Sequence, residues 1–222
     1  MSARDQILAR IRRANDAHVT GPADGAAVAR AYRDDVPRDY LTTHADRTPA
    51  QTVDLLAANL TEYRAHVHRT DEDGLPGLLA RLLADRGART VVVPPALPPH
   101  WLAGAGPARV PDHDGLATTE LDGADAVVTG CALAIAETGT IVLDAGPDQG
   151  RRRITLVPDH HICVVRVPAQ VVDSLPRALP RLDPTNPLTW ISGPSATSDI
   201  ELDRVEGVHG PRRLDVVLLG AQ

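Results

Sequence analysis

The side chains that could do chemistry gather in three short segments, and the first holds Glu137, Thr138 and Gly139. Apolar residues alternate in 132–136 and again in 140–143, which predicts a tight β-hairpin with Gly139 at the turn position that needs a positive φ. A carboxylate at the tip of a hairpin stands on a stiff support, so Glu137 could act as a base or as a nucleophile. A plain turn with a solvated glutamate fits the same spacing.

The second segment runs from Gly193 to Glu201 and is crowded with hydroxyl groups. Ser198 and Glu201 have the spacing of a capping box, which predicts the start of a helix at this point. The free N–H groups and the dipole of such a helix start favour binding of a carboxylate or phosphate. Helix capping without any ligand explains the same pattern.

The third segment runs from Gly207 to Arg212, directly before an apolar run. Glycines on both sides of His209 would let a ligand or another part of the backbone approach its imidazole closely. A histidine that titrates near neutral pH can move protons, and an arginine such as Arg212 can bind a carboxylate or phosphate through two N–H groups. A loop histidine with a purely local partner is the alternative.

A serine-hydrolase triad of Ser195, Asp199 and His209 is a further hypothesis that these segments raise. The GxSxG sequence that places the nucleophile on a strained turn in many hydrolases is absent. Triads are recognised by geometry rather than by sequence order, so we do not favour this hypothesis.

Two histidine pairs resemble metal ligands without the right placement. His66 and His68 are predicted to lie on a helix, where residues two apart point in different directions. His160 and His161 are predicted to lie at the edge of a strand. We therefore expect no metal site from either pair.

The two cysteines and the acidic run at 112–114 are not expected to bind metal either. Cys131 and Cys163 stand alone rather than in a CxxC pair, so within one chain they cannot assemble an iron-sulfur cluster or a structural zinc site. We predict that both are small buried apolar side chains. The 112–114 run falls in the segment 96–122, which is rich in Pro, Gly and Asp and is predicted to be an exposed polar loop.

These segments need a scaffold, and hydrophobic periodicity predicts one of alternating helices and strands. One helix is predicted to begin after Thr48, with Pro49 in its first position and helical spacing continuing to Val67. A second covers 75–86, and a third, interrupted by prolines, covers 169–182. The predicted strands are 90–93, 126–129, 162–167, 188–192 and 214–219.

This rhythm predicts an α/β fold with an open, mostly parallel sheet flanked by helices, together with an N-terminal helical arm and the β-hairpin. Residues 1–47 are predicted to form the arm, which begins with an amphipathic stretch over 1–14. Residues 48–222 are predicted to form the α/β domain.

Composition removes several classes of function. All 23 basic residues are arginine, so a Schiff-base lysine and a P-loop lysine are excluded. The net charge of -6 and an aromatic content of 2% argue against nucleic-acid binding. No run of apolar residues approaches the roughly 20 needed to span a bilayer, and we expect a cytoplasmic protein.

Taken together, the motifs resemble the lactate-utilisation protein C family, whose domain is called LUD. The matching residues are Thr129-Gly130-Cys131, the run Ala134 to Ile141, the run Pro194 to Glu201 and the run Gly207 to Pro211. This domain is similar to the superfamily of ribose-phosphate isomerase and the CoA transferases, which implies a pocket at the carboxyl ends of the strands. The superfamily's acyl-accepting glutamate would correspond most closely to Glu137, although the sequence around Glu137 departs from the transferase motif.

The resemblance implies a part in oxidising L-lactate to pyruvate beside partner proteins that carry iron-sulfur clusters, with no cofactor in this chain. Our hypothesis is a non-redox subunit that binds a small anionic metabolite, with Glu137 and His209 moving protons. There are two alternatives: an independent enzyme that acts on an acyl or sugar-phosphate substrate, and a metabolite-sensing regulator. The residues expected to contact the metabolite are Gly130, Thr138, Gly139, Ser195, Ala196, Thr197, Asp199, Gly210 and Arg212.

Overall fold

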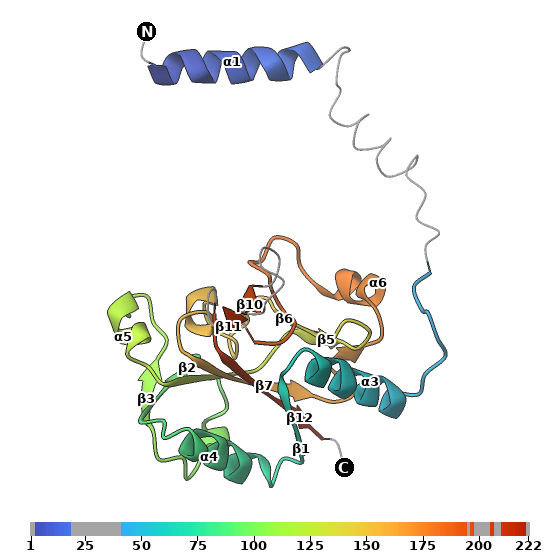
Figure 1. Cartoon of the computed structure of the whole chain (residues 1–222), viewed down its shortest axis with the longest axis vertical. Coiled ribbons are helices and arrows are strands. Elements are labelled where there is room, and N and C mark those ends of the chain that lie inside the picture. Colours follow the sequence, from blue (N-terminus) through green and yellow to red (C-terminus); the bar gives the residue numbers. More distant parts are fainter. Residues whose placement is uncertain (1–2, 19–40, 195, 198–204, 207–209, 221–222) are drawn as a thin grey trace. The chain divides into compact units, whose positions relative to one another are not determined.

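The computed structural model describes residues 3–18, 41–194, 196–197, 205–206 and 210–220 (Figure 1). The chain divides into two compact units, residues 1–41 and 42–222. In the first unit, helix α1 (Ala3–His18) exposes Ile7, Leu8 and Ile11. Residues 42–47, which the sequence places in the arm, contact the α/β unit: for example, the Ser174 hydroxyl donates to the Thr42 carbonyl at 2.7 Å.

A six-stranded sheet forms the centre of the α/β unit, and every neighbouring pair of strands in it is parallel. This confirms the predicted α/β fold with a mostly parallel sheet. In spatial order its strands are β1 (His66–Thr70), β12 (Arg213–Leu219), β7 (His160–Arg166), β4 (Ala126–Thr129), β2 (Thr90–Val93) and β3 (Ala108–Pro111).

A smaller four-stranded sheet contains the predicted hairpin, in which β5 pairs antiparallel with β6. Gly139 has φ +56° in the turn between them, as predicted. In spatial order the strands are β8 (Val171–Val172), β5 (Leu133–Ile135), β6 (Thr140–Leu143) and β9 (Thr189–Ile191). A separate antiparallel pair consists of β10 (Ala196–Thr197) and β11 (Val205–Glu206).

Two apolar layers hold the sheets and helices together. On one face of the six-stranded sheet, α4 (Leu75–Asp85) packs leucines such as Leu79 and Leu83 against Val164 and Val217. On the other face, α3 (Pro49–Glu62) and the smaller sheet cover Val165 and Val216. Figure 1 shows α4 on one side of β7 and β12, with β5 and β6 on the other.

The remaining helical segments are short. They are η1 (Pro99–Leu102), α5 (Thr118–Asp122), η2 (Arg152–Thr155), α6 (Leu175–Ala178) and η3 (Leu179–Arg181). Among the residues that the structure describes, no helix is both long and apolar enough to cross a membrane.

The helix predicted to continue to Val67 ends instead at Glu62, and Val67 lies in β1. The position of Val67 fits the spacing of apolar residues in a helix and also in a strand. Parallel pairing with β12 makes this segment a strand. The expectation that His66 and His68 diverge was therefore wrong, because residues two apart on a strand point to the same face.

The helix predicted over 169–182 was also wrong. The segment forms β8, the single turn α6 and the 3-10 turn η3. Pro176 and Pro180 prevent a longer helix, since each lacks the N–H group that a helix interior needs.

The segment predicted as an exposed polar loop, 96–122, contains η1, β3 and α5. Its Asp112 is buried, with 6% exposure, and accepts a hydrogen bond of 2.8 Å from the Arg151 Nε group. Ala196 and Thr197 form β10, and the helix start predicted at Ser198 falls on residues outside the described part. Residues 198–204 lie outside the described part.

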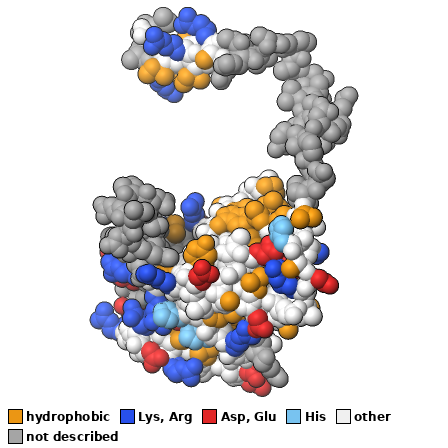
Figure 2. Space-filling model, turned by 45° about the vertical axis from the view of Figure 1, so that its right-hand side comes forward, with side chains coloured by type: hydrophobic (Ala, Val, Ile, Leu, Met, Phe, Trp, Pro, Cys, Tyr) orange, Lys and Arg blue, Asp and Glu red, His pale blue; other side chains and the backbone are white. Residues whose placement is uncertain are grey.

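Ion pairs account for many of the surface charges of the α/β unit. Figure 2 shows one face of it, where basic side chains lie interspersed with acidic ones. Exposed pairs of this kind include Arg69 with Asp54 at 2.6 Å and Arg212 with Asp159 at 2.8 Å.

Candidate functional site

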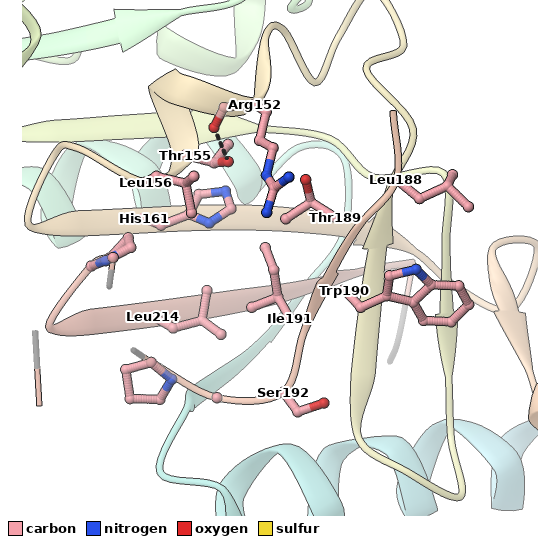
Figure 3. A pocket seen from close by; sticks show the side chains of 14 residues that line it. Arg152, Thr155, Leu156, His161, Leu188, Thr189, Trp190, Ile191, Ser192 and Leu214 are labelled. Carbon is pink, nitrogen blue, oxygen red and sulfur yellow. Dashed lines mark hydrogen bonds between the residues drawn. The ribbon is translucent and has the colours of Figure 1, made fainter. Parts of the chain in front are cut away.

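A pocket of about 470 Å³ lies where β9 passes the amino-terminal ends of β7 and β12 (Figure 3). We call it the β9 pocket. His161 of β7 and Leu214 of β12 form one wall, and Thr189 and Ile191 of β9 face them. The superfamily resemblance implies a pocket at the carboxyl ends of the strands, whereas this one opens at their amino ends.

The β9 pocket brings together the described parts of two predicted segments. Gly193 and Pro194, directly before Ser195, line it, and so do Gly210 and Pro211, directly after His209. Within the second segment, β10 pairs with β11, which ends directly before the third segment, and Ala196 is opposite Glu206. Of the predicted site residues, Ser195, Asp199 and His209 lie outside the described residues.

Three consecutive arginines precede β7, and their side chains make different contacts. Arg151 binds the Asp112 carboxylate, and the Arg153 Nη2 group donates to the Leu116 carbonyl. Arg152 instead points into the β9 pocket, between His161 and Thr189 (Figure 3). Its guanidinium has no ion-pair partner within the described ranges. Among the described residues, the pocket lining therefore contains a cation without a counter-ion.

His161 contributes an uncharged imidazole to the same pocket. Burial lowers its pKa from 6.5 to about 3, assisted by the nearby His160, so the ring is neutral at physiological pH. Its Nε2 atom lies 2.8 Å from the Thr129 hydroxyl, which fixes the orientation of the ring. The positive charge of the described pocket lining thus comes from Arg152.

Sequence reasoning missed both Arg152 and His161. The available signal was the order of the chain: an Arg run, a mostly apolar segment that ends in Pro158 and Asp159, and two histidines that open a buried strand. A strand start of this kind places successive side chains on opposite faces of a sheet, so only one histidine of the pair can face a given pocket.

Glu137 lies at the hairpin tip as predicted, but its partners come from the loop before α3. Its carboxylate is 2.7 Å from His44 Nδ1 and accepts a hydrogen bond of 3.0 Å from Arg47. Burial by itself would raise the pKa of Glu137, but the hydrogen bonds and charges of His44 and Arg47 outweigh it and lower that pKa. The carboxylate is therefore ionised and paired.

The hairpin turn is also held by α3. The Asn59 side-chain amide donates to the carbonyls of Ala136 and Glu137, at 2.7 and 3.2 Å. A Cβ atom on Gly139 would come within 2.9 Å of Asn59, so this close approach as well as the positive φ requires glycine.

A chain of hydroxyl groups connects the hairpin to the β9 pocket. Thr138 and Thr140 lie 2.8 Å apart at their Oγ1 atoms, and Thr140 lies 2.8 Å from the Ser192 hydroxyl. Ser192 lines the pocket. Glu137 itself is not among the described residues that line it.

Gly130 and Arg212 occupy other places. Gly130 follows β4, where its N–H donates to the Asp148 carbonyl at 2.9 Å, and a Cβ atom at this position would clash with the Asp148 carboxylate. Arg212 pairs with Asp159 and lines a second cavity. Of the described residues predicted to contact the metabolite, Gly210 is the one in the β9 pocket.

Comparison with known proteins gives one consistent family. The model of the LUD domain matches residues 53–219. Lactate utilization protein C of Deinococcus radiodurans is 49% identical over 165 residues, which are 72% of this chain and 76% of the relative. Lactate utilization protein C of Halalkalibacterium halodurans is 31% identical over 177 residues, 73% of this chain and 76% of the relative.

A solved structure shows the same fold. The crystal structure of a DUF162 family protein from Deinococcus radiodurans superposes with a TM-score of 0.67 and 40% sequence identity. The match covers 79% of this chain and 100% of that chain.

Proposed function

Because this chain belongs to the LUD domain family, we propose that it acts in lactate utilisation, as a non-redox component that binds a small anionic metabolite in the β9 pocket. Relatives named lactate utilization protein C support the role. The observation that supports the anion is Arg152, whose guanidinium points into the pocket without an ion-pair partner in the described part of the chain. An unpaired guanidinium in a concave site is suited to a carboxylate or phosphate.

The redox chemistry in this proposal belongs to partner proteins that carry iron-sulfur clusters. Cys131 and Cys163 are both buried in the apolar core, and two thiolates are fewer than the four that common clusters require. Within the described ranges, no three His, Cys, Asp or Glu side chains are grouped so that they could hold a metal ion.

The proposal keeps the roles that the sequence predicts for the other residues of these segments. Ser195 and the amides of Ala196 and Thr197 would hold the anion, and His209 would move a proton next to Gly210. Glu137 would join only after release from Arg47, since a paired carboxylate with a lowered pKa is a weak base.

Ligand-dependent unfolding of the full chain tests the anion site. L-lactate, pyruvate and inorganic phosphate are titrated against the protein, and we expect at least one to raise the melting temperature in a saturable way. Arg152→Gln should weaken that ligand by about 10- to 100-fold, because one charge-assisted contact is lost. Arg81→Gln, which removes the same charge from the exposed face of α4, is the control and should bind normally. Equal binding by the Arg152 and Arg81 variants, or no stabilisation by any anion, would refute the proposal.

Growth on L-lactate tests the biological role. A strain that lacks this protein should regain growth with the wild-type gene and grow poorly with the Arg152→Gln gene at equal protein level. Measuring turnover by the isolated protein with acyl and sugar-phosphate substrates addresses the alternative of an independent enzyme, and Glu137→Gln is the variant that would abolish such turnover.

A further inference from the structure

The β9 pocket is much larger than L-lactate or pyruvate. Its volume is about 470 Å³. A water molecule takes about 30 Å³ in the liquid, so this space corresponds to about 15 water molecules. Pockets of about 300–1,000 Å³ enclose ligands of the size of a drug molecule. An acid as small as L-lactate would therefore leave most of the pocket to water.

Part of the pocket wall is continuous with the apolar core. Leu214, which is 1% exposed, belongs to the core cluster that α3 and the smaller sheet cover, and Ile191 packs against that cluster. Both residues line the pocket, and Figure 3 shows them on the side towards which the Arg152 guanidinium extends. A water molecule finds no hydrogen-bond partner on such a surface, so an apolar group of a ligand is the better occupant.

Another apolar side chain of the lining is accessible to solvent. Leu156 lies directly after η2, lines the pocket and is 36% exposed. Pro194 and Pro211 line the pocket as well. An apolar chain that lies against these side chains removes its own surface and theirs from water, which stabilises the complex in proportion to the area covered.

The described part of the lining carries one formal charge, that of Arg152. No Asp or Glu is among these residues. His161 lies beside Leu214 in the pairing of β7 with β12, and its imidazole is neutral at physiological pH because burial lowers its pKa to about 3. A ligand with a single anionic group therefore matches the described lining. A second anionic group would lose its water without gaining a cation there.

We propose that the β9 pocket binds a monocarboxylic acid whose apolar chain is longer than the methyl group of lactate. Its carboxylate binds Arg152, and its chain lies along Ile191 and Leu214. This inference rests on the proposed function for the anion at Arg152, and it adds the class of molecule that carries the anion. No covalent bond forms or breaks, so the site is a binding site.

A chain-length series, titrated by ligand-observed NMR against the full chain, tests the apolar part of the proposal. Propanoate, butanoate, pentanoate and hexanoate differ by one CH₂ group at each step. Each added CH₂ should tighten binding about two- to fourfold, because more apolar surface leaves water. An affinity that does not change from propanoate to hexanoate would overturn the inference.

A dicarboxylic acid of the same length tests the single charge. Adipate has the carbon chain of hexanoate and a second carboxylate at its far end. It should bind at least about tenfold more weakly than hexanoate, because the second carboxylate would have to leave water for an apolar wall. Adipate binding as tight as hexanoate binding would contradict the proposed ligand class.

Two matched variants locate the chain of the ligand. Leu156→Thr should weaken hexanoate binding about three- to tenfold and leave propanoate binding unchanged, because the shorter chain covers less apolar surface. Leu179 is also an exposed leucine, at 52%, but it is not among the described residues that line the pocket. Leu179→Thr should therefore bind both acids as the wild type does. Equal hexanoate affinities for the two variants would place the chain elsewhere and refute the inference.

Failure of this inference is distinguishable from failure of the proposed function. If chain length has no effect while Arg152→Gln still weakens anion binding, the inference fails and the proposed function stands. If no carboxylate or phosphate binds to the wild-type protein, both fail.

Discussion

The Arg47 guanidinium donates a hydrogen bond of 3.0 Å to the Glu137 carboxylate, and this contact ties the hairpin tip to the loop before α3. Arg47 also lies 3.7 Å from Asp173, which accepts a hydrogen bond of 2.8 Å from the Thr52 hydroxyl. The hairpin, the start of α3 and the segment after β8 thus share one polar cluster. Glu137 has a structural role here that does not depend on any ligand.

Replacing Glu137 by glutamine should remove a pH-dependent part of the stability. The pKa of Glu137 is lowered from 4.5 on folding, so its contribution is complete above about pH 4.5 and is lost as the pH falls through the folded value. We expect Glu137→Gln to cost about 1–2 kcal/mol at neutral pH and progressively less in acid. Urea unfolding at a series of pH values measures this, with Glu72→Gln as the control. Parallel curves for wild type and Glu137→Gln would contradict the assignment.

Two glycines with similar positive φ angles allow the cost of backbone strain to be compared with the cost of a steric clash. Gly139 (φ +56°) and Gly87 (φ +63°) both disfavour a side chain, but a Cβ on Gly87 would meet nothing within 4 Å, whereas one on Gly139 would press on Asn59. Gly87→Ala should cost about 1 kcal/mol and Gly139→Ala about 2–4 kcal/mol, because α3 or the turn must move. Chemical denaturation of both variants is the measurement. Equal losses would show that Asn59 is not a steric limit.

Local patterns predicted the parts of the fold that depend on nearby residues. Thr48 caps α3, and the Gln51 side chain accepts the Thr48 N–H at 2.9 Å, which completes the predicted capping box. The hairpin with Gly139 in its turn, and α4 ending before Gly87 at φ +63°, are further cases. In each of these, residues only a few positions apart determine the conformation.

The parts that could not be predicted depend on distant partners. Val67 continues an apolar helical period, yet it becomes part of a strand because it is placed beside Val216, 149 positions later in the chain. The His68 contact with Asp215 spans 147 positions. The role of Arg152 likewise depends on where β9 passes. Periodicity carries no information about such contacts.

Asp215 should be among the most sensitive polar positions of the fold. It is fully buried and accepts hydrogen bonds from His68, His160 and Arg213, so Asp215→Asn leaves buried donors and the Arg213 charge without their partner. We expect a loss of about 3–5 kcal/mol in the free energy of unfolding. Asp159→Asn breaks only the exposed pair with Arg212 and should cost about 0–1 kcal/mol. Similar losses in both variants, measured by urea unfolding, would refute the central role of Asp215.

The pKa of Asp215 also sets the sign of a pH effect. Because folding lowers this pKa below 3.8, the stabilising contribution is present above about pH 3.8 and is lost only as the pH falls further, through the folded value. The difference between wild type and Asp215→Asn should therefore shrink as the pH falls from about pH 5 to well below pH 3.8. A difference that is the same at pH 5 and well below pH 3.8 would contradict a lowered pKa of Asp215.

His161 should oppose folding in mild acid. Its pKa falls from 6.5 in the unfolded chain to about 3 in the fold, so below about pH 6.5 the unfolded state binds a proton that the folded state does not. Stability from this group should decline by up to about 1.4 kcal/mol per pH unit as the pH is lowered towards 3, and His161→Gln should remove that slope. Unfolding measured from about pH 7.5 to about pH 4.5, with His66→Gln as the control, tests this.

The neutral state of His161 also affects anion binding in the β9 pocket. Between about pH 8 and about pH 5, anion binding should depend on Arg152 and gain nothing from His161. An NMR signal of His161 that titrates in this range would contradict both this prediction and the predicted effect of His161 on stability.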